Sequence, residues 1–125
     1  MATIYTDVGE AKVVDIIDGS ASSPVDIGTG NNFIAWGTGG GTAVKGSTTL
    51  FTEAAEARVG GTVTQPSADI NQWVAEITSA SGQTITNAGL FDASSSGVLV
   101  IHGDFTGIVL NTSDKIEFTI SLEQT

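Results

Sequence analysis

The sequence of 125 residues contains no cysteine, one histidine and two prolines. Without cysteine the protein has no disulfide, no thiolate metal ligand and no cysteine nucleophile. One histidine cannot supply a multi-histidine metal site. We therefore expect no catalytic, metal-binding or cofactor-binding residues, and we predict that the protein is not an enzyme.

Positive charge is also scarce, with 4 Lys and Arg against 14 Asp and Glu and a formal net charge of −10. This balance argues against nucleic acid or an anionic membrane as a partner. The longest apolar runs, such as Val98–Ile101, are far shorter than the roughly 20 residues that span a bilayer. Residues 1–7 lack the basic and apolar regions of a secretory signal, so we expect synthesis in the cytoplasm.

Small polar residues dominate what is present: 17 Thr, 16 Gly and 12 Ser, with only 14% charged residues and 40% apolar ones. Thr favours strands, whereas Gly and Ser favour turns. A mean hydropathy of +0.20 is too high for a disordered chain. The composition predicts one folded, mainly β domain.

The N-terminal 30 residues are predicted as a helix or arm followed by a loop. Asp7 and Glu10 have the spacing of a capping box, and Gly19 can end the helix. Between Asp7 and Gly19, apolar residues recur at helical spacing: Val8, Ala11, Val14 and Ile17. The β-branched residues among them also suit a strand. An extended arm could add a strand to the sheet edge of a neighbouring molecule.

Residues 31–125 are predicted to form the second part, an antiparallel β-sandwich of the jelly-roll type. Turn residues separate short apolar segments at the spacing typical of such folds. In the last segment, apolar and polar residues alternate strictly from Lys115 to Glu123. We expect one helical turn at 52–57. Gly103-Asp104 separates two continuous apolar stretches, which suits strands buried on both faces or a tight hairpin. The other expected strands are Phe33–Trp36, Arg58–Gln65, Asn71–Thr78, Thr84–Asp92, Gly97–His102 and Phe105–Leu110.

The glycine-rich segment Gly37–Gly41 is a candidate for a phosphate-binding loop. Such a loop needs a following helix and a lysine directly after a glycine, as in the Walker motif, but the residue before Lys45 is Val44. The segment is therefore interpreted as a turn beside a close backbone contact. A triad of His102, Asp104 and one of Ser94–Ser96 lacks a nucleophile-elbow motif. We expect His102 to end a strand with one ring nitrogen hydrogen-bonded.

Carboxylates show no EF-hand spacing, and Asp104 and Asp114 are interpreted as isolated turn residues. A structural cation shared between chains, or a carboxylate pair for glycoside hydrolysis, stays open at this point. Arg58 is expected to pair with Glu53, with Glu56 or with a neighbouring chain.

Trp36 and Trp73 are candidates for stacking on sugars, but their apolar strand patterns favour anchors of the sandwich core. The triplet Asn111-Thr112-Ser113 matches a glycosylation site and is interpreted as a turn. Neither feature points to a binding site.

Three motifs become informative in combination: aromatic-Gly-Thr-Gly at Trp36–Gly39, Leu-x-x-Glu at Leu50–Glu53 and Gly-Leu-Phe-Asp at Gly89–Asp92. With the segments around them, the chain resembles small virion proteins of tailed bacteriophages. Tyr5–Asp18 matches more loosely. The matching segments are Phe33–Gly39, Thr48–Val59, Ile85–Ala93, Gly97–Leu99 and Ser113–Ile120.

The resemblance implies a structural role in the virion, since the family includes capsid decoration (cement) proteins and tail-fibre-like proteins. The chain has no collagen-like, coiled-coil or repeated segment for a fibre shaft, which favours decoration. The resemblance then implies a homotrimer that binds the major capsid protein on the outer capsid surface and stabilises the shell. The alternatives are a tail-fibre, collar or tail-tip module in host adsorption, and a stand-alone carbohydrate-binding β-sandwich.

Overall fold

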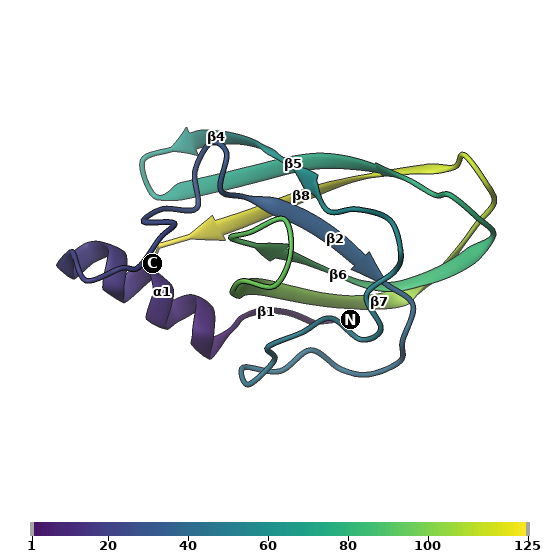
Figure 1. Cartoon of the computed structure of the whole chain (residues 1–125), viewed down its shortest axis with the longest axis horizontal. Helices are drawn as coiled ribbons and strands as arrows, with labels where there is room; N and C mark the ends of the chain where they lie inside the picture. The colour runs from purple at the N-terminus through teal and green to yellow at the C-terminus, as the bar shows by residue number, and fades with distance from the viewer. Residues whose placement is uncertain (1, 125) are drawn as a thin grey trace.

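Two antiparallel sheets face each other in the computed structural model, which describes residues 2–124 (Figure 1). The larger sheet has the order β1-β7-β6-β2-β3 and the smaller one β4-β5-β8. The mainly β sandwich predicted from the sequence is confirmed. The strands are β1 (Ala2–Tyr5), β2 (Phe33–Gly37), β3 (Val59–Gly60), β4 (Thr62–Ser67), β5 (Ile70–Thr78), β6 (Gln83–Phe91), β7 (Leu99–Leu110) and β8 (Lys115–Glu123).

The predicted helix is present as α1 (Asp7–Asp18), and Gly19 ends it with φ 81°. The predicted N-cap was wrong by one residue. Thr6, in an extended conformation, caps the helix by accepting a hydrogen bond from the Gly9 N–H at 3.0 Å. Asp7 and Glu10 lie in the first turn, where carboxylates favour the positive end of the helix dipole.

The residues before α1 form an edge strand of the chain's own larger sheet. β1 pairs with β7 in a register that runs from Ala2 opposite Asp104 to Tyr5 opposite Ile101. The strand that an N-terminal arm was expected to donate to a neighbour is therefore paired within the chain. The start of the predicted helix-or-arm region belongs to the sandwich, and its remainder is α1 and the loop that leads to β2.

One long strand, β7, replaces the two strands expected on either side of Gly103 and Asp104. The alternative of a tight hairpin was wrong because both sides of the chain are paired there. Gly103 lies opposite Thr3 on β1 and opposite Ala88 on β6. The register of β6 with β7 shifts between Ile85 and Asn87, whose partners Ile108 and Asp104 are four residues apart on β7.

Two further expectations were wrong between residues 52 and 67. Residues 52–57 form no helical turn, and Glu53 makes an isolated bridge with Gly37 instead. The strand expected over Arg58–Gln65 is divided at Gly61 into β3 and β4, which lie in different sheets. A Cβ at Gly61 would lie 2.5 Å from Asn32 Oδ1, so the chain passes from one sheet to the other at a contact that excludes a side chain.

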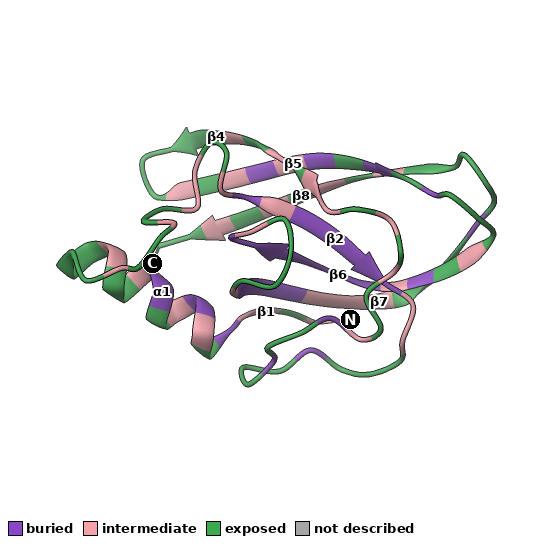
Figure 2. Cartoon of the chain, in the orientation of Figure 1, coloured by how far each residue is buried: buried purple, intermediate pink, exposed green. Residues whose placement is uncertain are grey.

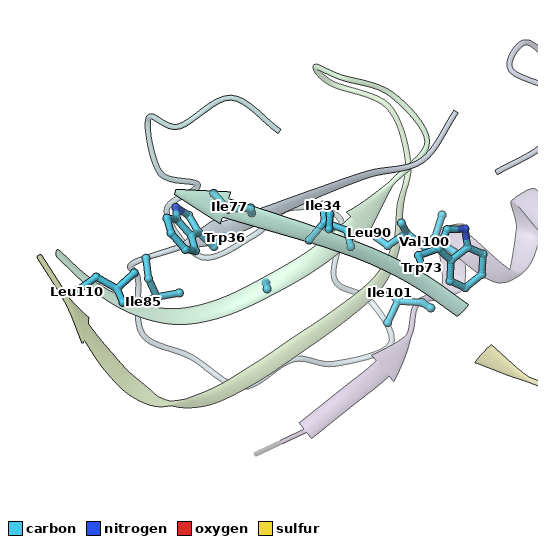
Figure 3. Packing of buried hydrophobic residues seen from close by; sticks show 11 residues of the cluster. Ile34, Trp36, Trp73, Ile77, Ile85, Leu90, Val100, Ile101 and Leu110 are labelled. Atoms are coloured by element: carbon cyan, nitrogen blue, oxygen red, sulfur yellow. The ribbon is translucent and has the colours of Figure 1, made fainter. Parts of the chain in front are cut away.

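The main core fills the space between the two sheets (Figures 2 and 3). Trp73, Ala75 and Ile77 alternate along β5 with more exposed residues and face inward. A smaller cluster on the opposite face of the larger sheet consists of Ala35, Leu50, Phe91 and Leu99. The large side chains of the main core include Ile34, Trp36, Trp73, Ile77, Ile85, Leu90, Val100, Ile101 and Leu110.

Candidate functional site

The glycine-rich segment that begins at the end of β2 is hydrogen-bonded to residues 51 and 52. The N–H groups of Thr38 and Gly39 donate to the carbonyls of Thr52 and Phe51 at 3.0 and 2.9 Å. A Cβ at Gly37 would lie 2.5 Å from the Phe51 carbonyl oxygen. The close backbone contact expected of this segment is confirmed, but Gly37 belongs to β2 and residues 38–41 are extended or irregular and form no turn.

His102 lies inside β7 and is completely buried, so the expectation that it ends a strand was wrong. Its Nε2 is 3.1 Å from Asn87 Oδ1, and that oxygen also accepts the Phe51 N–H at 3.0 Å. An amide oxygen only accepts, so Nε2 carries the proton in the neutral ring. Nδ1 has no hydrogen-bond partner among residues 2–124. The prediction that one ring nitrogen of His102 is hydrogen-bonded is confirmed.

The residues considered for a catalytic triad have other partners. Asp104 lies within β7 and not in a turn, and its carboxylate accepts the N–H groups of Ala43 at 2.7 Å and Ala2 at 3.2 Å. Both hydrogen bonds lower the pKa of Asp104, and the hydrogen bond from Ala43 has the largest effect. Ser94–Ser96 lie in the loop after β6, where the Ser96 carbonyl accepts a hydrogen bond from Arg58.

Among residues 2–124, no three His, Cys, Asp or Glu side chains form a group that could hold a metal ion. Asp114 is a turn residue, as expected, and its carboxylate accepts the Asn111 N–H at 2.7 Å. It joins the start and end of the turn between β7 and β8.

Both tryptophans are core anchors, as their strand patterns favoured (Figure 3). Trp36 and Trp73 expose only 1% and 2% of their surface. The Trp36 Nε1–H donates to Glu56 Oε1 at 3.0 Å, and the Trp73 Nε1–H donates to the Ile27 carbonyl at 2.9 Å. Neither ring offers a face on which a sugar could stack.

Arg58 pairs with Glu53, one of the two carboxylates expected. Its Nε and one terminal nitrogen donate to the two Glu53 oxygens at 2.8 and 2.9 Å. The other terminal nitrogen donates to the carbonyls of Ala93 and Ser96, and the guanidinium carbon lies 3.5 Å from the centroid of the Phe91 ring. Arg58 thus fastens the loop after β6 to the segment before β3.

Glu56 has a different role, for which no sequence pattern offers a signal. Besides Trp36, it accepts hydrogen bonds from the Ala80 N–H at 2.9 Å and from the Gln83 side chain. Partial burial acts to raise the pKa of Glu56, but the hydrogen bonds from Ala80, Trp36 and Gln83 outweigh it and lower the pKa.

The apolar stripe of α1 faces away from the sandwich. Val14 and Ile17 are 59% and 80% exposed, whereas Gly9 and Lys12 are buried (Figure 2). A Cβ at Gly9 would lie 2.4 Å from the Val100 carbonyl oxygen, so the helix approaches β7 on its glycine side. The approach of Gly9 to β7 turns the stripe toward solvent. We call Ala11, Val14 and Ile17 the α1 stripe.

A cavity of about 430 Å³ lies beside the buried face of α1, against the segments around residues 22–24 and 92–98. Lys12 Nζ lies 3.4 Å from Asp92 Oδ2 at this cavity and also donates to the carbonyls of Ser22 and Pro24. The lysine is fully engaged by the chain's own groups, so the cavity offers a ligand no free cation from Lys12.

Carboxylates surround the α1 stripe. Asp15 and Asp18 lie on the exposed surface of the helix, and Asp7 and Glu10 in its first turn pair with Lys45. This end of the molecule therefore combines exposed apolar side chains with negative charge.

Comparisons with protein-family models, with curated proteins and with solved structures found no match. In the described part of the chain, α1 is too short and too polar to cross a membrane.

Proposed function

We propose that the protein is a structural subunit of a virion and acts as a capsid decoration protein. It binds the major capsid protein on the outer surface of the shell as a homotrimer and stabilises the shell. The proposal rests on the resemblance carried by residues 33–120 and on the nature of the exposed surface. It assigns no bond-making step to the protein.

The observation that carries the proposal is the exposed α1 stripe. Val14 and Ile17 form a helical i, i+3 pair that the chain itself does not cover. Contiguous exposed apolar surface with a polar rim is typical of protein-binding sites. The surrounding Asp15 and Asp18 favour a partner surface with an apolar centre and basic margins.

Copy number in purified particles tests the assignment to the shell. A decoration protein is expected in hundreds of copies, because it repeats with the capsid lattice. Six or fewer copies, or a low multiple of three, would contradict it and favour a tail-fibre, collar or tail-tip module in host adsorption.

A substitution tests the proposed surface. Ile17→Glu should weaken co-sedimentation with shells that lack the protein by about tenfold or more, because it places a charge in the apolar contact. Val109→Glu is the matched control, since Val109 is also exposed (76%) but lies on β7. Equal binding of Ile17→Glu and the unsubstituted protein would rule out the α1 stripe as the contact.

A further inference from the structure

The two sheets of the sandwich do not match in width. Five strands face three, and β8 pairs with β5 on one side but with no strand of residues 2–124 on the other. The Phe118 ring on β8 lies 6.3 Å from the rings of both Trp36 on β2 and Phe105 on β7. β8 therefore lies opposite β6, and β7 and β1 continue beyond its free edge (Figure 1).

An open groove lies beside the middle part of that free edge, at residues 118–121. A cavity of about 160 Å³ has its floor on β1, β6 and β7 and its wall on residues 118–121 of β8. Phe105, Phe118 and Ile120 line it and are only half-buried, whereas the aromatic and aliphatic side chains of the closed core are buried. Gly103 is among the residues that line the floor, and it places no side chain there.

We propose that this groove accepts one extended segment of a partner protein, which pairs with β8 as a fourth strand of the smaller sheet. A free strand edge offers main-chain hydrogen bonds to such a segment, and the adjacent apolar floor offers contacts to alternate side chains. The added strand would cover Phe105 and Phe118 and would continue the smaller sheet over β7.

Charge defines the chemistry of the segment. The outward row of β8 carries Lys115, Glu117 and Glu123, and Lys115 Nζ lies 3.5 Å from Glu76, which balances it. Glu117 and Glu123 leave the outward row of β8 with a net negative charge, and the whole chain has a net charge of −10. Opposite charges across neighbouring strands stabilise their pairing. The segment therefore has apolar residues on its inward face and Lys or Arg on its outward face.

A second copy of this chain is a poor occupant. If two copies paired through β8, β7 and β1 of one copy would approach β7 and β1 of the other. These strands project beyond β8 in each copy and would keep the two β8 strands apart. The inference goes beyond the proposed function and does not depend on it, since a strand donor need not be part of a virion.

Synthetic nine-residue peptides test the groove directly. One alternates Val and Lys, a second has the same composition in separate apolar and basic blocks, and a third alternates Val and Glu. We expect the first to shift NMR amide signals of residues 101–105 and 116–122 with a Kd below about 1 mM. The second and third should bind about tenfold more weakly or worse at low salt.

Variants of the full chain separate groove binding from general attraction. Gly103→Leu should fill the groove and weaken binding of the Val-Lys peptide about tenfold or more. The three atoms nearest to a Cβ at Gly103 belong to Thr3 and Ala2 and lie at 3.4–3.9 Å, which is ordinary van der Waals contact, so the backbone accepts a Cβ there. Gly60→Leu on β3, at the opposite edge of the same sheet, is the matched control and should leave binding unchanged.

A second variant tests the charge argument without touching the floor. Glu117→Lys combined with Glu123→Lys should reverse the preference and favour the Val-Glu peptide. The proposal is overturned by equal binding of the block peptide, by no amide shift at about 1 mM Val-Lys peptide with folded protein, or by an unchanged preference in the double variant. Self-association that shifts the β8 amides without peptide would also overturn it, in favour of a second copy.

Discussion

Lys12 on α1 and Asp92 after β6 form a buried ion pair, with 3.4 Å between Nζ and Oδ2 and side chains only 7% and 4% exposed. The pair joins two segments that are far apart in the sequence and attaches α1 to the loop between β6 and β7. Asp92 also accepts the Val98 N–H at 2.7 Å through its other oxygen. The ion pair of Lys12 with Asp92 and the close packing of Gly9 against Val100 therefore both hold α1 on the sandwich.

Removing one member of this pair should be costly. Lys12→Met leaves the Asp92 carboxylate buried without its cation, and we expect the free energy of unfolding to fall by about 3 kcal/mol. Asp92→Asn added to Lys12→Met should recover part of the loss, because the neutral amide can still accept from Val98. Urea titration measures both. A loss below about 0.5 kcal/mol in the single variant would show that the pair contributes little.

Arg58 should not tolerate lysine. Lysine cannot reproduce the two-pronged contact with Glu53 together with the two carbonyl contacts and the stacking on Phe91. We expect Arg58→Lys to lower the free energy of unfolding by about 1–3 kcal/mol. Lys115→Arg, at an exposed ion pair, serves as the control with an effect near zero. Equal stability of the two variants would contradict the prediction.

The glycine-rich segment offers an internal comparison. A Cβ at Gly37 would lie 2.5 Å from a backbone oxygen, whereas a Cβ at Gly40 would meet nothing within 4 Å. Gly37→Ala should cost about 2 kcal/mol or more, and Gly40→Ala should change stability by less than about 0.5 kcal/mol. Thermal unfolding of the two variants side by side measures the difference. If neither substitution changes the stability, the backbone at Gly37 and Phe51 can move apart at little cost.

His102 predicts a dependence of stability on pH. Burial lowers its pKa, against the opposing effect of the Asp104 carboxylate, and a proton on Nδ1 would find no acceptor among residues 2–124. The unfolded state then binds the proton more readily, so the contribution of His102 is present above about pH 6.5 and is lost as pH falls through the lower folded-state pKa.

Urea titrations between about pH 7.5 and 5 should show this loss, and His102→Gln should flatten the slope in that window. The lowered pKa of Glu56 produces its own loss of stability only in more acidic solution, below about pH 4.5. An identical slope for His102→Gln and the unsubstituted protein would assign the pH dependence to other groups.

Local patterns identified several elements well. The strict alternation in Lys115–Glu123 predicted β8, because a period of two matches only a strand with one buried face. The spacing around Val8–Ile17 and the position of Gly19 predicted α1, and the apolar surroundings of Trp36 and Trp73 predicted core anchors. For Arg58 the sequence left Glu53, Glu56 and a neighbouring chain open as partners, and the structure selects Glu53.

Contacts between distant segments decided the rest. Gly103 and Asp104 resemble a turn by themselves, but β1 and β6 pair with them from both sides and keep β7 extended. The α1 stripe resembles a core face, but the close approach of Gly9 to Val100 turns it outward. The sequence alone determined the type of most elements, because hydrophobic period is a local property. Which face of each element is covered, and which edge stays open, was decided only in the tertiary structure, since the covering residues come from elsewhere in the chain.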